Sequence, residues 1–217
     1  MKRFNILAHR GIFFNKNTEN SEEALCTALS NRFGIETDLR DFGGKIVISH
    51  DPPRGGSSPM TFDWLLKQIK SSHTNGRIAL NIKSDGLASM IDADIKRSGI
   101  SVDRFFVFDM SVPDSLSYLK GSIPVYSRIS DYEIEPPFKD KAAGIWVDNF
   151  DGSYPQVRNA KELMKEGLSA TIVSPELHGR DHRSVWNEIL TSEIYLNPLF
   201  RICTDFAEEA ALQFCKD

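Results

Sequence analysis

The sequence is poor in cysteine, in long apolar runs and in excess positive charge. Its three cysteines, Cys26, Cys203 and Cys215, match neither a zinc-binding nor a redox spacing, and their odd number fits a reducing compartment. The apolar run after Met1 stops at His9, which is too short for a secretory signal, and no run is long enough to cross a bilayer. We therefore expect a cytoplasmic protein without membrane insertion.

The charge balance excludes another class of partner. The 217 residues carry a net charge of −4, with 26 basic and 30 acidic side chains. Binding to a nucleic-acid polymer needs a basic surface, so we do not expect it. With 41% hydrophobic residues and no break in composition, the chain suits one sizeable core but is too short for two ordinary domains. We predict a single domain over residues 1–217, of unknown oligomeric state.

Short apolar runs alternate with amphipathic segments along the whole chain, which indicates repeated strand–helix units. Residues 35–40 and 45–49 are predicted to form a small hairpin after the second strand. Without the hairpin there are about eight units, the number that closes a TIM (β/α)8 barrel, here a compact one. A doubly wound open sheet is the competing architecture, but no Gly-x-Gly-x-x-Gly follows the first strand. The other strands are expected at 4–8, 77–83, 104–109, 123–128, 143–147, 169–173 and 200–204, and the helices at 18–32, 61–69, 86–98, 113–119, 154–166, 183–190 and 207–214.

Polar side chains collect just after the apolar cores of the predicted strands. In a parallel barrel these strand ends converge on the face that carries active sites, which favours an enzyme. Taken singly, Asp109, Asp148 and Asp205 are explained as well by helix capping, and Asn20 is the predicted N-cap of the helix at 18–32.

Glu36 and Asp38 are the sharper signal. They lie two residues apart in a predicted strand, so their side chains point to the same side. Inside a barrel, two neighbouring carboxylates are costly unless a cation lies between them. Oxygen ligands favour Mg²⁺, Ca²⁺ or Mn²⁺ over zinc. In the next barrel strand, Asn81 has a carbonyl oxygen to add, and Lys83 is suited to an anionic oxygen.

Two histidines, His9 and His50, each end a strand and precede a charged residue. A histidine pair suits general acid–base chemistry near neutral pH. A divalent cation with Arg10 and Lys83 nearby suits the charge of a transferring phosphoryl group.

Five short motifs follow one another along the chain: His9-Arg10-Gly11, Glu19-Asn20-Ser21, Glu36-x-Asp38-x-Arg40, His50-Asp51 and Thr204-Asp205-Phe206. In their order and spacing, the sequence resembles the glycerophosphodiester phosphodiesterases. The resemblance implies a TIM barrel with one divalent cation, usually Mg²⁺ or Ca²⁺. It implies that His9 and His50 are the general base and acid, and that Glu19 supports His9. It also implies phosphate contacts from Arg10 and Lys83, and metal binding by Glu36 and Asp38.

The sequence departs from the family pattern on the third barrel strand. Where the family has Glu-x-Lys, this chain has Asn81-Ile82-Lys83, so one metal carboxylate is missing and Asn81 is the expected third ligand. Asp51, Asp148 and Glu176 are alternative replacements that the spacing does not distinguish. The insert after His50, at 51–76, is short, so we expect an open pocket or one that a partner chain covers.

A further departure lies at the end of the seventh strand, where the family more often has an aromatic residue and a Thr-x-Asn pattern. Residues 174–180 instead carry Glu176, His178 and Arg180. We predict that Glu176 and Arg180 bind the substrate by reading a polar head group such as a sugar or nucleotide. The alternative is an ion-paired loop.

The predicted function is metal-dependent hydrolysis of a small phosphodiester by a phosphoric diester hydrolase. One alternative is attack by a hydroxyl of the substrate, which yields a cyclic phosphate, as in the related phospholipase and sphingomyelinase D barrels. The other is a barrel without catalysis that only binds a ligand. Asn81 keeps this last alternative open, whereas the two histidines and the carboxylate pair weigh against it.

Overall fold

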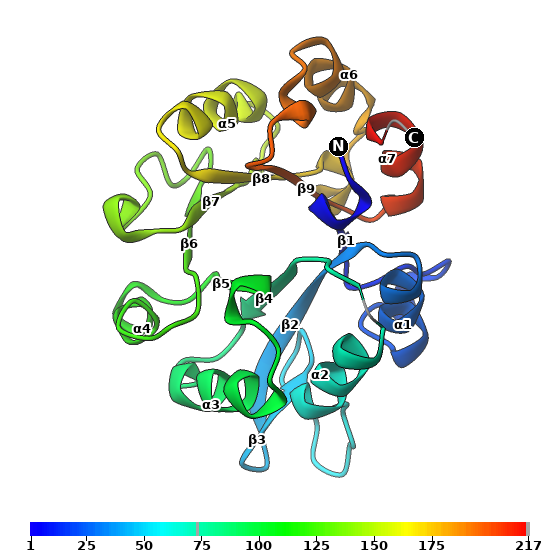
Figure 1. The fold of residues 1–217 in the computed structure, drawn as a ribbon, viewed down its shortest axis with the longest axis vertical. Coiled ribbons are helices and arrows are strands. Elements are labelled where there is room, and N and C mark those ends of the chain that lie inside the picture. Colours follow the sequence, from blue (N-terminus) through cyan, green and yellow to red (C-terminus); the bar gives the residue numbers. More distant parts are fainter. Residues whose placement is uncertain (73, 216–217) are drawn as a thin grey trace.

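The computed structural model describes residues 1–72 and 74–215. Its parallel strands form a ring in the order β5-β4-β2-β1-β9-β8-β7-β6. An isolated parallel bridge between Val107 and Val125 joins the two ends of this ring. Helices surround the ring on the outside (Figure 1). This arrangement confirms the predicted TIM barrel and excludes the open sheet.

The ring is built from β1 (Ile6–His9), β2 (Gly34–Phe42), β4 (Ile78–Ile82), β5 (Phe105–Phe108), β6 (Tyr126–Ile129), β7 (Gly144–Val147), β8 (Ser169–Val173) and β9 (Phe200–Thr204). The α-helices are α1 (Glu22–Ser30), α2 (Phe62–Ser71), α3 (Ala88–Ser98), α4 (Val112–Tyr118), α5 (Gln156–Lys165), α6 (Arg183–Thr191) and α7 (Ala207–Phe214).

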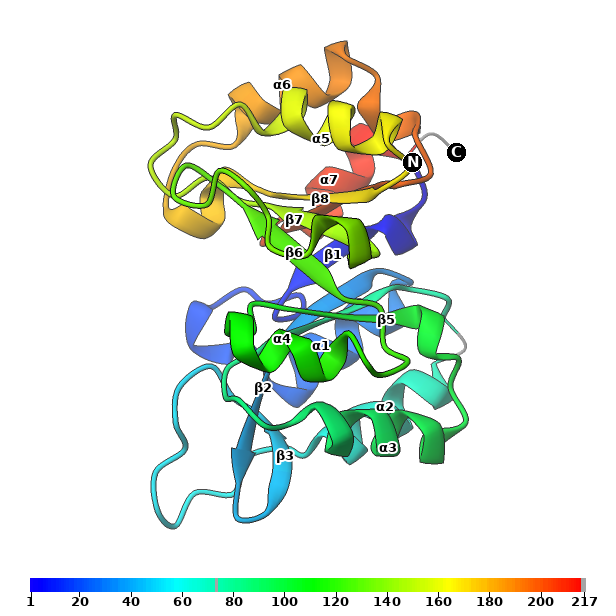
Figure 2. The same ribbon diagram turned by 90° about the vertical axis from the view of Figure 1, so that its left-hand side faces the viewer.

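The predicted hairpin is present. Strand β3 (Lys45–Ile48) runs antiparallel to β2, with Leu39 opposite Ile48. Figure 2 shows the hairpin and the loop after it on the side of the molecule away from both chain termini.

The start of the first helix was predicted wrongly. Helix α1 begins at Glu22, and its N-cap is Ser21, whose hydroxyl accepts from the Ala24 amide at 3.2 Å. Asn20 lies before the helix with a positive φ of 57°. Its side chain is therefore not a cap, and it is used in the candidate active site.

Alternation along the strands separates two apolar regions. One set of side chains packs between the strands and the helices, including Ile6, Ile35 and Ile202. The other set fills the inside of the barrel, where Trp146 stacks on Phe108 with ring centroids 4.0 Å apart. These inward rings form a floor beneath the carboxyl ends of the strands. In the described part of the chain, no helix is long and apolar enough to span a membrane.

Candidate active site

A cavity of about 370 Å³ opens at the carboxyl ends of the strands, where TIM barrels carry their active sites. We call the groups on and beside β1, β2, β4 and β9 the β1 side, and those on β5 to β8 the β7 side. The β1 side contributes His9, Arg10, Glu36, Asn81, Lys83 and Asp205, and the β7 side contributes Asp109, Arg128, Asp148 and His178.

His9 forms a pair with Asp205. Its Nδ1 lies 2.7 Å from Oδ1 of Asp205, and its Nε2 lies 3.8 Å from Oε2 of Glu36. Burial lowers the pKa of His9, but the hydrogen bond to Asp205 and the charges of Glu36 and Asp205 outweigh burial and leave the pKa raised. The carboxylate of Asp205 therefore fixes the ring and leaves Nε2 toward Glu36, which is the arrangement of an acid–base histidine.

The predicted metal ligands meet across neighbouring strands. His9 lies beside Glu36 in the β1–β2 register, and Asp38 lies beside Asn81 in the β2–β4 register. Glu36, Asp38 and Asn81 are all buried, and each has one oxygen without a hydrogen-bond partner: Oε2, Oδ1 and Oδ1, respectively. Each such oxygen costs about 1–3 kcal/mol when it stays unpaired. Two carboxylates and an amide oxygen are a donor set that suits Mg²⁺ or Ca²⁺.

The Asn81 amide contributes the third oxygen of this set. Among residues 1–72 and 74–215, no group of three or more His, Cys, Asp or Glu side chains is placed to hold a metal ion. Burial, and then the charge of Asp38, raises the pKa of Glu36 to about 7. The charged form of Glu36 is thus disfavoured mainly by burial and then by the charge of Asp38, and a cation beside the pair would favour it.

Arg10 and Lys83 are brought to the same carboxylate. Nε of Arg10 lies 2.9 Å from Oδ2 of Asp38, and Nζ of Lys83 lies 3.5 Å from Oδ1. Nη1 of Arg10 also donates to Glu19 at 2.6 Å. Glu19 therefore supports Arg10 directly, and the described contacts do not link it to His9. Both cations line the cavity, where an anionic oxygen can reach them.

The turn after β1 needs an unusual backbone. Arg10 has a φ of 55° and Gly11 a φ of 96°. A side chain at Gly11 would lie 2.5 Å from the backbone of Ala24, so α1 can pack here only against glycine. The His-Arg-Gly motif is thus explained by the need to place Arg10 over Asp38 next to the first helix.

Asn20 is a site residue whose role the sequence prediction missed. Its Nδ2 donates to Oδ2 of Asp38 at 2.9 Å, and its Oδ1 accepts from the Thr37 hydroxyl at 2.7 Å. Asn20 therefore links the Asp38 carboxylate to the Thr37 hydroxyl of the same strand and fixes the orientation of the carboxylate. The sequence contains one signal for this role. Asn20 and Ser21 are adjacent capping residues, and because a helix uses only one N-cap, the other side chain is free to bond elsewhere.

His50 lies at the rim of the cavity rather than deep inside it. Its side chain is 49% exposed, and Nδ1 lies 2.8 Å from Oδ1 of Asp51, which is itself exposed. Nε of Arg40 donates to the His50 carbonyl at 2.9 Å and ties this loop to β2. Asp51, one of the alternative replacements for the missing metal carboxylate, is therefore paired with His50 in this structure.

Glu176 and Arg180 do not line the cavity. Glu176 is buried, and it accepts hydrogen bonds from the hydroxyls of Ser174 and Thr204 and, at 3.1 Å, from the Asp205 amide. It therefore holds the loop that carries the partner of His9. The guanidinium of Arg180 donates to the Asn149 carbonyl. Within the described chain, neither residue forms an ion pair, so these neutral contacts differ from the ion-paired loop that was the alternative, and substrate binding by the two residues stays a prediction.

The β7 side brings together residues with different expected roles. Asp109 and Asp148 were explained as well by helix capping, Arg128 had no predicted role, and His178 belongs to the segment 174–180 expected to read a head group. Nε2 of His178 lies 2.7 Å from Oδ1 of Asp148, which also accepts from the Asn149 amide at 2.8 Å. Arg128 pairs with Asp109 at 3.0 Å and with Glu133. Burial raises the pKa of Asp109 although Arg128 opposes this. A positive φ of 67° at Asp109 turns its side chain into the cavity and marks a constrained position.

Comparison with known proteins shows the fold. No family model matches the sequence, and no curated protein is significantly similar to it. Solved structures match over nearly the whole chain. A glycerophosphodiester phosphodiesterase from Agrobacterium tumefaciens str. C58 has a TM-score of 0.69 at 19% identity, over 96% of this chain and 98% of the other.

Two further structures agree with the first. A glycerophosphodiester phosphodiesterase from Parabacteroides distasonis ATCC 8503 has a TM-score of 0.69 at 17% identity, over 96% of this chain and 95% of that one. An Oleispira antarctica phosphodiesterase, solved with its product sn-glycerol-3-phosphate, has a TM-score of 0.66 at 15% identity, over 98% and 97%. At these identities the likeness establishes the shared barrel.

Proposed function

We propose that the protein is a phosphoric diester hydrolase of the glycerophosphodiester phosphodiesterase type, and that residues 1–217 form its single catalytic domain. The observation that carries this proposal is the meeting of three kinds of group in one cavity. These are a histidine held by a carboxylate, a cluster of buried oxygens that lack hydrogen bonds, and two cations within ion-pair distance of that cluster. The proteins that share the barrel include phosphodiesterases, one of them with a bound glycerol phosphate, which supports the same chemistry here.

The oxygens of Glu36, Asp38 and Asn81 would hold one divalent cation, Mg²⁺ or Ca²⁺, with Mn²⁺ as a further candidate. When bound, such a cation supplies positive charge to the phosphoryl oxygens. Arg10 and Lys83 add donors for the same oxygens. Because Asp38 already holds both cations close to the ligand set, a phosphate that binds there meets them without a large rearrangement.

The two histidines transfer the protons of the reaction. One of them removes a proton from the attacking water while its oxygen bonds to phosphorus. The other gives a proton to the alcohol oxygen as its bond to phosphorus breaks. We assign this pair to His9 and His50. His9 is held by Asp205 deep in the cavity, and the exposed rim position of His50 suits the side from which water or alcohol enters and leaves.

The β7 side is suited to the alcohol part of the substrate. Its charged groups already have partners, so they offer hydrogen bonds without adding a large net charge. The stacked rings of Phe108 and Trp146 form the adjoining floor. We therefore propose a hydroxyl-rich head group, a sugar or the sugar of a nucleotide.

The test is a panel of phosphodiesters with glycerol, choline, inositol and nucleoside head groups, incubated with Mg²⁺, Ca²⁺ or Mn²⁺ and followed by phosphorus NMR. We expect a phosphate monoester to form with at least one of these cations and a chelator to abolish it. A cyclic phosphate as the product would instead identify transfer to a substrate hydroxyl. If no phosphodiester in the panel reacts with any of the three cations, the hydrolase proposal fails and a binding barrel is favoured.

A further inference from the structure

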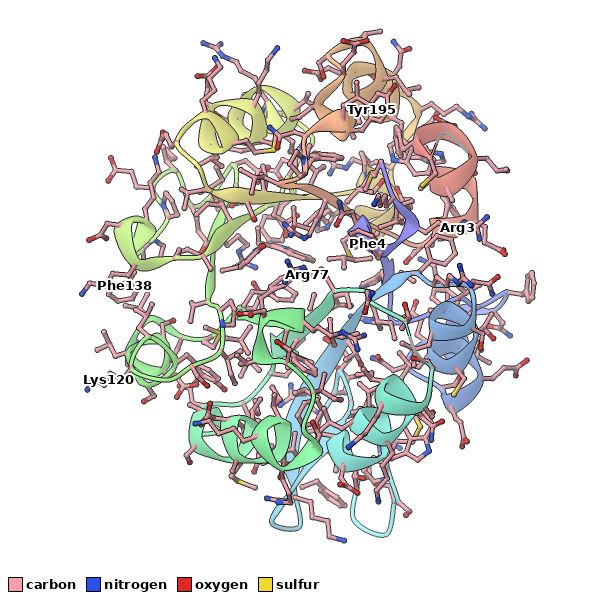
Figure 3. All side chains as sticks on the ribbon, in the orientation of Figure 1. Arg3, Phe4, Arg77, Lys120, Phe138 and Tyr195 are labelled. Atoms are coloured by element: carbon pink, nitrogen blue, oxygen red, sulfur yellow. The ribbon has the colours of Figure 1, made fainter. Side chains whose placement is uncertain are left out.

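The end of the barrel opposite to the candidate active site has an unusual interior. Arg77, Arg104 and Arg201 each lie two residues before an inward-facing side chain, namely Ala79, Phe106 and Cys203. Arg201 lies in β9 and faces the inside of the ring with Cys203, because strand side chains alternate. Arg77 and Arg104 directly precede β4 and β5 at the same amino end of the ring. Figure 3 shows Arg77 near the centre of this ring.

Arg77 and Arg104 are locked beside each other by reciprocal contacts. The Arg77 guanidinium donates to the carbonyl of Asp103, and the Arg104 guanidinium donates to the carbonyl of Gly76 at 3.2 Å. Each arginine therefore bonds to the backbone that directly precedes the other. The β4–β5 register, in which Ile78 pairs with Phe105, places the two residues at the same level.

Arg201 comes from the other side of the ring. Its Nη1 donates to the Tyr126 hydroxyl and to the Leu199 carbonyl, both at 3.2 Å. Strand β9 is separated from β6 by β8 and β7, so the contact with Tyr126 crosses the barrel interior. Only 5% of Arg201 is exposed, and its Nε has no hydrogen-bond partner.

No carboxylate within residues 1–72 and 74–215 forms an ion pair with any of these three arginines. Nε of Arg104 is a second buried donor without a partner. Burial, and then the charge of Arg77, lowers the pKa of Arg104. Burial also lowers the pKa of Arg201; the Tyr126 side chain opposes this and the Arg77 charge adds to it. Fixed donors of one sign are thus gathered here without a balancing anion from the described chain.

We propose that Arg77, Arg104 and Arg201 form an oxyanion site at the amino end of the barrel, which binds inorganic phosphate or the phosphate group of a monoester. The planar guanidinium forks match the oxygens of a phosphate, and charge-assisted hydrogen bonds of this kind are the strong ones. The free Nε donors of Arg104 and Arg201 are the groups that such an anion would satisfy. This site is independent of the hydrolase proposal, because it shares no residue with the carboxyl-end cavity.

The competing explanation is structural. In a TIM barrel the helices end near the amino ends of the strands, and arginines can neutralise the negative ends of their dipoles. That role needs no ligand. It predicts that loss of an arginine destabilises the protein without phosphate and leaves phosphate binding unchanged.

The experiment is calorimetric titration with inorganic phosphate in the Lys83→Met background, which removes a phosphate contact at the carboxyl-end cavity. We expect the background protein to keep one phosphate site. Adding Arg77→Gln or Arg201→Gln is expected to weaken that site at least about tenfold, since each removes a charge-assisted contact. The matched control is Arg183→Gln, an exposed arginine on α6 whose partner is Asp181. It is expected to leave binding unchanged.

Thermal unfolding keeps the test valid if a variant is less well folded. Without phosphate, Arg77→Gln is expected to unfold at the same temperature as its parent or higher, because a like charge is removed. Phosphate is expected to raise the unfolding temperature of the parent and to have a smaller effect on the variant. Phosphate binding that is absent from the background, or equally tight in the background and in both arginine variants, would overturn the site.

Discussion

The two sides of the cavity balance their charges in different ways. On the β1 side, Glu36, Asp38 and Asn81 each keep a buried oxygen without a hydrogen bond, although His9 and Lys83 lie 3.8 Å and 3.5 Å from the Glu36 and Asp38 oxygens. On the β7 side, Asp148 is bonded to His178 and to a backbone amide, and Arg128 lies between two carboxylates. One side is therefore incomplete in its hydrogen bonding, and the other is nearly complete.

Because of this difference, the two sides of the cavity are suited to different ligands. A cluster of buried oxygens that lack hydrogen bonds, two of them on carboxylates, is suited to binding a cation. Charged groups that already pair with one another need no added ion, so this side is suited to neutral hydroxyls that bind at the remaining donors and acceptors. Substitutions on the β1 side are thus expected to affect turnover and metal binding, and those on the β7 side to affect substrate choice.

The largest effect is expected at the histidines. His9→Ala and His50→Ala are each expected to lower kcat by about 10²–10⁴, the usual loss when acid–base assistance is removed. Turnover of the best phosphodiester in the panel measures this. The control is His182→Gln, because His182 lies outside the cavity and bonds to Glu209 at 3.3 Å. Near-normal turnover in either cavity variant contradicts its assigned role.

The next largest effect is expected when the contact between Asp205 and His9 is removed. Asp205→Asn keeps the shape of the side chain but removes the carboxylate that fixes the His9 ring at 2.7 Å. We expect kcat to fall by about 10- to 100-fold with KM little changed, as is typical when the partner of a functional histidine is removed. A change in KM alone would assign Asp205 to substrate binding, through its position in the cavity wall.

The sequence predicts the barrel well because each strand and helix is encoded locally. The bounds of β8, β9 and α7 agree residue for residue with the prediction, since apolar runs of fixed period stand between clear turn residues. The start of α1 could not be placed in this way. Asn20 and Ser21 are both good capping residues, and only tertiary contacts with Thr37 and Asp38 decide between them.

The site is predicted less evenly than the fold. Residues that share one strand, such as Glu36 and Asp38, can be matched from spacing alone. Pairs between side chains at the ends of two neighbouring strands, such as Asp148 with His178 or His9 with Asp205, depend on the strand order and on the conformation of the loops that follow the strands. For the same reason, spacing could not show that Glu176 turns away from the cavity toward the Asp205 amide.

A smaller effect, on metal affinity, is expected from a substitution at Asn81 on the β1 side. Asn81→Glu is expected to tighten binding of Mg²⁺ or Ca²⁺ at least about tenfold, because it adds a third charged ligand beside Asp38. Calorimetric titration with each metal measures this. Asn187→Glu, the same change at an exposed position of α6, is the control. Unchanged affinity in the Asn81 variant would mean that the amide lies outside the metal site.

The smallest effect concerns the β7 side and separates two assignments of the head-group contacts. His178→Gln removes a side chain that lines the cavity and holds Asp148, so we expect KM to rise about three- to tenfold while kcat changes little. The rise is expected for the substrate with the most hydroxyls and not for a choline diester, which has no hydroxyl on its head group. Arg180→Ala is the comparison, because the sequence predicts substrate contact there, whereas the guanidinium bonds to the Asn149 carbonyl. A larger rise in KM for Arg180→Ala than for His178→Gln would support the assignment made from the sequence and move the head-group site toward residues 174–180.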